Sequence, residues 1–149
     1  MKSLFNPEYN REIIDRLQKL NSKSAPVWGK MTAAQMVTHA QAPFKVALEE
    51  LQLKRGLLGI LFGGIAKKKL LSPEPFGKNL PTDKNFIVKR HPDFEIEKNK
   101  LVGYIQRFSK SGPGGITTKA HPFFGKLTPE EWDTLVSKHM DHHLRQFGA

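Results

Sequence analysis

The chain has 149 residues, of which 38% are hydrophobic and 26% charged, and it contains no cysteine. Disulfides, thiolate nucleophiles and thiolate metal sites are therefore excluded, and any metal must be held by nitrogen and oxygen ligands. The net charge of +10 is uneven, since residues 54–126 carry 15 Lys and Arg against 5 Asp and Glu, whereas the remainder carries 9 of each sign.

The first twenty residues predict a helix and no targeting segment. Residues 1–8 contain no apolar run that resembles a secretory signal, so we expect a cytoplasmic protein. Asn6 suits a helix N-cap and Pro7 suits the first helical turn. An apolar side follows, formed by Ile13, Ile14, Leu17 and Leu20. We expect this helix to serve packing only.

A second helix is predicted to begin after Thr32, because Thr32 and Gln35 have the spacing of a capping box. Apolar residues recur at helical spacing as far as Leu51. His39 falls beside this apolar face, so periodicity alone favours a boundary residue over a metal ligand. Pro43 removes a backbone hydrogen bond, and we expect it to bend the helix.

The run from Leu57 to Ala66 is apolar and is flanked by five cations. Ten residues are too few to span a bilayer as a helix. A short buried helix is the main interpretation, and a helix that docks on an anionic membrane surface remains open because cations border the run. Nucleic acid is not the expected partner of this basic middle section, because no RNA-binding signature or zinc-finger spacing is present.

Residues 72–83 contain three prolines and are expected to form a loop. Apolar spacing predicts a further helix from about Pro92 to Ser109. Residues 111–115, Ser-Gly-Pro-Gly-Gly, should then form a turn, since no Gly-Lys-Ser/Thr follows to make a phosphate-binding loop. Strand alternation is absent, so we expect an all-α chain with four long helices and one shorter apolar helix.

His121 precedes Pro122, which favours an extended backbone at the histidine. Such a residue can direct its imidazole inward from a loop. A surface position packed by Phe123 and Phe124 is slightly preferred.

The last helix carries the clearest chemical signal. Its start is predicted by Thr128 as N-cap and Glu131 as capping-box partner. An apolar stripe follows, formed by Trp132, Leu135, Val136, Met140, Leu144 and Phe147. His139 and His143 lie one turn apart near the middle of that stripe. Two imidazoles so spaced, facing a bundle core, are what a helix offers when it supplies two metal ligands.

The alternative to metal binding is that His139 and His143 are buried core residues that hydrogen-bond to their neighbours. An apolar stripe cannot easily supply partners for two adjacent imidazoles, whereas a metal ion satisfies one nitrogen on each ring. The metalloprotease pattern His-Glu-x-x-His is absent, because Met140 follows His139. The Gly-x-Ser-x-Gly elbow of serine hydrolases is absent as well.

Three parts of the sequence resemble a known family. The last helix has the pattern His-x-x-His-His-x-x-Gln, and the early segment has Trp28, Met31-Thr32, Gln35-Met36 and His39. Both patterns resemble the DinB/YfiT-like superfamily, whose members are regarded as metal-dependent enzymes. Residues 121–132 look like an uncharacterised branch of it, a domain of unknown function. The resemblance covers most of the chain and is weakest over residues 54–90.

The resemblance implies a DinB-like four-helix bundle in a single domain, residues 1–149. It also implies a divalent metal held by His39, His139 and His143, with Pro43 supplying the twist that turns His39 inward. His142 matches a motif position without being a ligand. The chain departs from many relatives after the last histidine, where it has Leu-Arg in place of Arg-Gly.

A metal such as zinc, nickel or iron held in this way keeps a coordination position open. The resemblance thus implies an enzyme acting on a small-molecule substrate, either hydrolase-like or a transferase that uses a low-molecular-weight thiol. No general base is identified, and the candidates for supporting groups are Glu49, Glu50, His121 and Gln146. The alternatives are a non-enzymatic basic module that binds nucleic acid or an anionic membrane, and a bundle with a structural metal. A homodimer is one option for assembly.

Overall fold

The computed structural model describes residues 2–149, and over that range its regular secondary structure consists of helices without a β-strand. The α-helices are α1 (Pro7–Gln18), α2 (Ala33–His39), α3 (Ala42–Ala47), α4 (Leu57–Leu71), α5 (Phe94–Ser111) and α6 (Pro129–Gln146). Two short 3₁₀-helices are η1 (Lys84–Phe86) and η2 (Pro113–Gly115). The predicted all-α class is confirmed.

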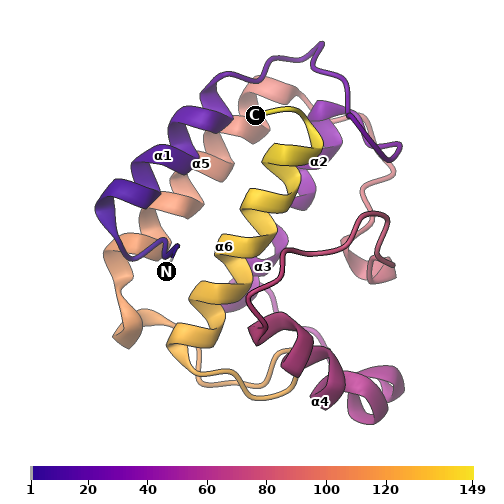
Figure 1. Cartoon of the computed structure of the whole chain (residues 1–149), viewed down its shortest axis with the longest axis vertical. Coiled ribbons are helices and arrows are strands. Elements are labelled where there is room, and N and C mark those ends of the chain that lie inside the picture. Colours follow the sequence, from indigo (N-terminus) through magenta and orange to yellow (C-terminus); the bar gives the residue numbers. More distant parts are fainter. Residues whose placement is uncertain (1) are drawn as a thin grey trace.

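Four rods of helix form a bundle, and one of the rods is broken into α2 and α3. Figure 1 shows α6 in the centre of the view, with α1 and α5 on one side and α2 and α3 behind it. α5 contacts α1, α2 and α3, and α6 contacts α1 and α3. α4 lies outside these rods, at the lower right of the view, and contacts α6. This is the predicted four-helix arrangement with an additional apolar helix.

Large aromatic side chains lie among the aliphatic residues of the core between the rods. Phe108 of α5 is fully buried, stacks on Phe5 with ring centroids 4.9 Å apart and meets Phe44 of α3 edge-on at 5.7 Å. Trp132 of α6 is fully buried too. Such side chains bury the largest apolar areas in a core, so they hold the helices that carry the histidines in place.

Helix starts follow the predicted capping residues. Asn6 caps α1 through its side-chain oxygen. Thr32 with Gln35, and Thr128 with Glu131, form reciprocal capping boxes at α2 and α6. A side-chain N-cap stabilises a helix by about 1 kcal/mol, so the starts of α2 and α6 are set locally by the sequence.

Pro43 breaks the second rod. α2 ends at His39, four residues before Pro43, because proline has no N–H to donate to the His39 carbonyl. The helix resumes at Ala42, with Pro43 in the first turn of α3. The predicted bend is therefore an interruption that falls directly after His39.

The segments around α5 also follow the prediction. α5 covers nearly the predicted range, and Asp93 is its N-cap. Gly112 ends it with a φ of +61°, a conformation that favours glycine. Residues 72–83 contain neither helix nor strand, as expected for a proline-rich loop.

α4 differs from the prediction in length and in exposure. It has 15 residues, and its buried positions are Gly59, Gly63 and Leu70. Leu57 and Leu61, which a buried helix would hide, are 71% and 61% exposed. The buried-helix interpretation is wrong, because a helix that is apolar on all sides gives no periodic signal for the side that faces the protein. Among residues 2–149, no helix combines the length and apolar character needed to cross a bilayer.

Candidate metal centre

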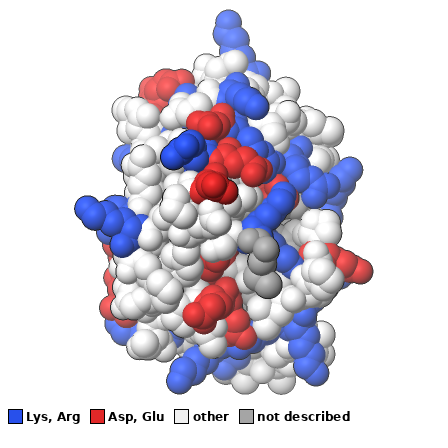
Figure 2. Space-filling view, turned by 60° about the vertical axis from the view of Figure 1, so that its left-hand side comes forward, with Lys and Arg blue, Asp and Glu red and all other residues white. Residues whose placement is uncertain are grey.

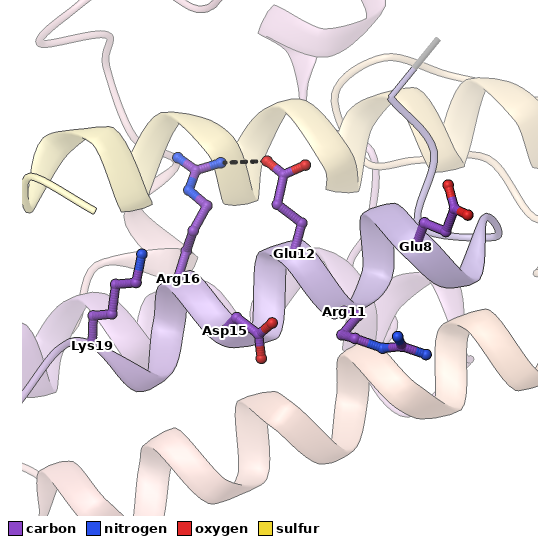
Figure 3. A pocket seen from close by; sticks show the side chains of 6 residues that line it. All are labelled: Glu8, Arg11, Glu12, Asp15, Arg16 and Lys19. Atoms are coloured by element: carbon purple, nitrogen blue, oxygen red, sulfur yellow. Dashed lines mark ion pairs between the residues drawn. The ribbon is translucent and has the colours of Figure 1, made fainter.

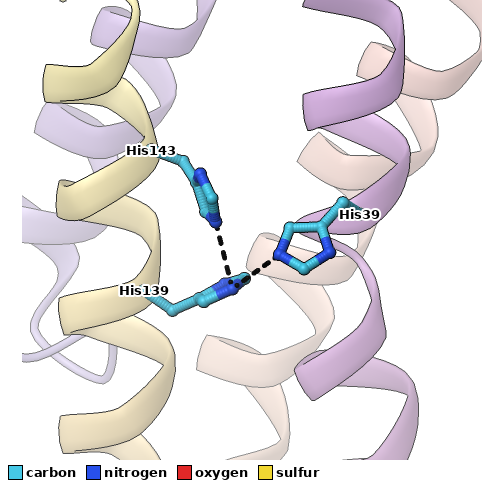
Figure 4. Close-up of side chains that lie close together, drawn as sticks. All are labelled: His39, His139 and His143. Carbon is cyan, nitrogen blue, oxygen red and sulfur yellow. Dashed lines mark hydrogen bonds between the residues drawn. The ribbon is translucent and has the colours of Figure 1, made fainter. Parts of the chain in front are cut away.

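Three histidines from two helices meet between α2 and α6 (Figure 4). His139 and His143 lie one turn apart on α6, and His39 is the last residue of α2. The Nε2 atom of His139 lies 3.2 Å from Nε2 of His39 and 3.2 Å from Nε2 of His143. The structure thus brings together the three histidines that the sequence singled out, in a cluster that could hold a metal ion.

His39 is the member of the cluster whose surroundings differ from the expectation drawn from periodicity. Periodicity over residues 33–51 treated α2 and α3 as one straight helix, and on such a helix His39 lies at the edge of the apolar face. The helix is in fact interrupted after His39, and His39 is only 8% exposed, with the Phe86 carbonyl against its ring. The boundary position predicted from periodicity is therefore wrong.

The outer nitrogen of two rings faces an oxygen that can only accept. Nδ1 of His39 is 2.9 Å from the backbone carbonyl oxygen of Phe86, and Nδ1 of His143 is 2.8 Å from Oε1 of Gln146. The Gln146 amide is oriented by its Nε2, which donates to the backbone carbonyl of Trp28 at 3.0 Å. Both Nδ1 atoms therefore carry the proton of the neutral imidazole. Both Nε2 atoms are left bare and direct their lone pairs toward His139.

His139 cannot satisfy this arrangement by itself. Its Nε2 faces the two bare nitrogens, and its buried Nδ1 has no hydrogen-bond partner within residues 2–149. With the proton on Nε2, Nδ1 is a buried acceptor without a donor. With the proton on Nδ1, three bare nitrogens converge and repel one another. A cation between the Nε2 atoms would remove that repulsion, so the donor set fits a metal ion.

The spacing of the nitrogens also fits a divalent ion. Two nitrogen ligands that lie about 2.1 Å from zinc at a tetrahedral angle are separated by about 3.4 Å. The Nε2 atom of His139 lies 3.2 Å from Nε2 of each of the other two histidines. An all-nitrogen set agrees with a chain that has no cysteine.

Burial keeps the three imidazoles neutral. It lowers the pKa of His143 to about 3 and holds the pKa of His139 well below its ordinary value. Burial also lowers the pKa of His39, although the hydrogen bond to the Phe86 carbonyl opposes this shift. Neutral imidazole is the form that binds metals, so these histidines need not release protons to bind one near pH 7.

Gln146 attaches the loop before α2 to the end of α6. Its side chain bridges Trp28 and His143. Its backbone carbonyl accepts a hydrogen bond from the backbone N–H of Val27 at 2.7 Å. Gly29 has a φ of +82°, and a Cβ at this position would lie 2.7 Å from Nε2 of Gln146. A larger residue at Gly29 would therefore displace the amide that holds His143.

The segment between α4 and α5 covers the His39 side of the cluster. The Phe86 carbonyl in η1 binds His39 directly. Two residues further on, the Val88 carbonyl accepts from Nε2 of Gln35 at 3.1 Å. Gln35 thus has two roles, since its Oε1 also caps α2.

The remaining histidine candidates lie outside the cluster. His121 is buried, and its Nδ1 accepts from the backbone N–H groups of Phe123 and Phe124 at 3.0 and 3.2 Å. It shapes the loop before α6, so the preferred surface position is wrong. His142 lies beside the cluster, with its ring centroid 5.1 Å from that of His143, and does not belong to it.

The two candidate carboxylates make their contacts elsewhere. Glu50 accepts from the hydroxyl of Tyr104 and pairs with Arg107 at 2.6 Å. Glu49 accepts from Oγ1 of Thr117 at 2.7 Å. Over residues 2–149, the metal-compatible group contains no Asp or Glu. Of the four candidate supporting residues, Gln146 alone touches the cluster.

A hollow on the surface of α1 offers no comparable chemistry. It is lined by Glu8, Arg11, Glu12, Asp15, Arg16 and Lys19 (Figure 3). The three acidic and three basic side chains balance one another, and Glu12 pairs with Arg16 at 3.7 Å. Figure 2 shows the side of the molecule that carries α1 and α5, where acidic and basic side chains are interspersed. Among residues 2–149, the basic side chains seen on this face are interrupted by acidic ones.

Comparison with known proteins yields a family and no described activity. The family model "Protein of unknown function (DUF1569)" matches residues 9–149 and so includes all three histidines. Neither the curated proteins nor the solved structures contain a match to the chain.

Proposed function

Because the chain belongs to the DUF1569 family of proteins of unknown function, we propose its function from the histidine cluster itself. His39, His139 and His143 bind a divalent metal, and the protein is a metal-dependent enzyme that acts on a small molecule. The observation that carries this proposal is the convergence of Nε2 atoms whose outer nitrogens are held by pure acceptors. Zinc, nickel and iron all suit an imidazole site.

We further propose that the family is related to the DinB/YfiT-like superfamily. The pattern His-x-x-His-His-x-x-Gln on α6 supports this relation, as does a histidine at the end of α2, at the break within the second rod of a four-helix bundle. The superfamily expectation of one ligand from the second helix and two from the last agrees with the positions of the clustered histidines.

A metal bound by three neutral imidazoles keeps a position for an exchangeable ligand and supplies Lewis acidity toward a water or a thiolate. The residues of this chain contribute in other ways. Phe86 and Gln146 fix the ring orientations, and burial keeps the rings neutral. Hydrolase-like chemistry and transfer to a low-molecular-weight thiol both remain within this proposal.

Metal analysis of protein purified without a histidine tag tests the ligand assignment. We expect about one divalent ion per chain in the unaltered protein, and loss of it in His139→Ala and in His143→Ala. His91→Ala is the matched control, because His91 is exposed in a loop and lies outside the cluster. Unchanged metal content in both α6 variants would show that the assignment is wrong.

A structural metal in a buried cluster is the second candidate function, favoured by the burial of His39 and His143. The two candidates differ in ligand exchange. Cobalt-substituted protein should change its visible spectrum when a small thiol is added if the metal has an exchangeable position. A spectrum that does not respond, together with a fall in melting temperature on chelation, would favour the structural role. Turnover with and without added thiol then separates transferase from hydrolase.

A further inference from the structure

Residues 57–65 of α4 place six large apolar side chains in solvent. They are Leu57, Leu58, Ile60, Leu61, Phe62 and Ile65, each exposed by between 52% and 71%. We call this set the α4 patch. It lies on a helix outside the four rods of the bundle (Figure 1). A contiguous apolar patch on a protein surface marks a site of interaction.

The orientation of α4 is fixed by close packing on its other side. A Cβ at Gly59 would lie 2.7 Å from the carbonyl oxygen of Pro122, and one at Gly63 would lie 2.3 Å from that of Phe123. The helix backbone can approach the loop this closely only because both positions are glycine. Lys67 fastens the following turn, since its Nζ is 2.7 Å from a carboxylate oxygen of Glu131 and 2.8 Å from the backbone carbonyl oxygen of Lys126. The α4 patch is therefore held facing outward.

The charged residues that border the α4 patch in the sequence have one sign. Residues 51–73 contain no Asp or Glu and have five cations, namely Lys54, Arg55, Lys67, Lys68 and Lys69. Lys54, Lys68 and Lys69 are exposed, and none of them forms an ion pair with a residue in the range 2–149. Apolar side chains bordered by unpaired cations are complementary to a lipid surface with anionic headgroups.

A second copy of this chain is less complementary. Two α4 helices that met through their patches would bring the cations of both copies together, in either relative direction. No acidic residue in the range 51–73 would offset that repulsion. An anionic bilayer supplies the missing negative charge.

We propose that α4 docks the protein on an anionic membrane surface. The six side chains of the α4 patch enter the boundary between headgroups and acyl chains, and Lys54, Lys68 and Lys69 contact the headgroups. The helix lies in the plane of the interface, buried by about 5–10 Å. This docking is separate from the histidine cluster and requires no metal.

Sedimentation of the full chain with vesicles tests the proposal. We expect binding to vesicles of phosphatidylcholine with about 30% phosphatidylserine, weakening as salt rises, and none to phosphatidylcholine alone. Lys68→Glu with Lys69→Glu should weaken binding at least about fivefold per lysine. The control is Lys23→Glu with Lys110→Glu, which changes net charge equally at exposed positions outside α4.

Insertion of the apolar side chains has its own readout, because the chain has no cysteine. Leu61→Cys gives a single attachment point for an environment-sensitive fluorophore on the α4 patch. Ile96→Cys is the control, since Ile96 is 56% exposed on α5. With anionic vesicles, emission should shift to the blue at position 61 and stay unchanged at position 96.

Three outcomes would overturn the proposal. The first is that the unaltered protein fails to sediment with phosphatidylserine vesicles. The second is that both pairs of lysine substitutions weaken vesicle binding equally, or that emission at position 61 does not shift. Either result would mean that the protein is attracted by charge alone and that α4 does not insert. The third is concentration-dependent dimerisation that Leu61→Glu abolishes, without vesicle binding, which would assign the patch to a second copy. Circular dichroism checks that each variant folds.

Discussion

Two acceptors outside the histidine cluster determine where its protons lie. Phe86 contributes a backbone carbonyl, which no side-chain substitution removes. Gln146 contributes a side-chain oxygen, and its amide is held in one orientation by the Trp28 carbonyl. Gln146 is therefore the position at which the proton arrangement can be tested by mutation.

Gln146→Leu should lower metal affinity about 10–100-fold although all three histidines remain. Without the Oε1 acceptor, the proton of His143 is no longer confined to Nδ1, and the ring loses its fixed orientation. Competition with a chromophoric chelator measures the change. Gln106→Leu, at an exposed position of α5, is the control. Equal affinity in the two variants would contradict this role of Gln146.

A buried carboxylate gives the stability a defined pH dependence. Oε2 of Glu97 accepts from Gln41 and Oε1 accepts from Lys100, both at 2.8 Å. Burial raises the pKa of Glu97, but these hydrogen bonds outweigh it and the pKa is lowered from its ordinary value of 4.5. A carboxyl whose pKa is lowered by folding stabilises the protein above its unfolded pKa. That stabilisation is lost as pH falls through the folded-state pKa.

Glu97→Gln should therefore lower the urea midpoint at pH 7 and make it fall less steeply below about pH 5. Urea unfolding at a series of pH values measures both effects. Glu95→Gln is the control, because the Glu95 side chain is 63% exposed on the same helix. The prediction fails if the two variants lose stability in parallel as the solution is acidified.

Single residues also show where sequence reasoning succeeds and where it does not. His139 and His143 could be predicted, because an i, i+4 pair within one helix is fixed by helix geometry. The position of His39 could not be derived from periodicity, because that argument needs an unbroken helix and Pro43 breaks it. The Phe86 carbonyl could not be predicted either, since every residue has one and nothing in the sequence marks which carbonyl will reach a histidine.

At the scale of elements, α4 shows that two adjacent glycines on one helix can have opposite surroundings. Gly63 is buried against the Phe123 carbonyl, whereas Gly64, one residue later, has open space where a Cβ would lie. In the sequence the two residues are adjacent glycines, and nothing there distinguishes one from the other. Their different surroundings come from a loop about sixty residues further along the chain.

Alanine at these two positions should have opposite effects. Gly63→Ala places a methyl group against the backbone of Phe123 and should destabilise the packing of α4 on the rest of the protein by about 1–3 kcal/mol. Gly64→Ala should stabilise the helix by about 0.5–1 kcal/mol through higher helix propensity. Hydrogen exchange of the α4 amides measures both. Equal changes of the same sign in the exchange rates of the two variants would mean that α4 does not pack on the protein through Gly63.

Local signals predicted elements better than they predicted packing. Thr32, Gln35, Thr128 and Glu131 mark two helix starts correctly, because a capping box is complete within four residues. The exposure of Leu61 could not be predicted in this way, since it depends on what the opposite side of the helix touches.

At the scale of the whole molecule, metal binding should stabilise the fold. A ligand that binds the folded chain alone adds about 2.7 kcal/mol at a free concentration of about 100 times its dissociation constant. We therefore expect zinc to raise the melting temperature by several degrees and a chelator to reverse the rise. His139→Ala should show no such response. A similar rise in that variant would mean that the stabilising metal binds elsewhere.

The net charge of +10 could be counted from the sequence, but its arrangement could not. Both signs mix on the side that carries α1 and α5 (Figure 2), whereas unpaired lysines border the apolar residues of α4. Charge counts along the chain identify a basic section. Only the fold shows that part of this section surrounds an apolar surface.

Lys138 precedes His139 on α6 and has a consequence for how the molecule opens. Its ammonium donates to three carbonyls at and after the end of α4, those of Leu70, Ser72 and Glu74. The chain then continues to Phe86, whose carbonyl binds His39. Residues 72–86 are thus held at both ends: Lys138 binds carbonyls at the start of the segment, and His39 hydrogen-bonds to the carbonyl at its end. We therefore expect local unfolding of residues 72–86 to release the end of α4 and the ring of His39 together, so that solvent access to the histidines is coupled to the anchoring of the outermost helix.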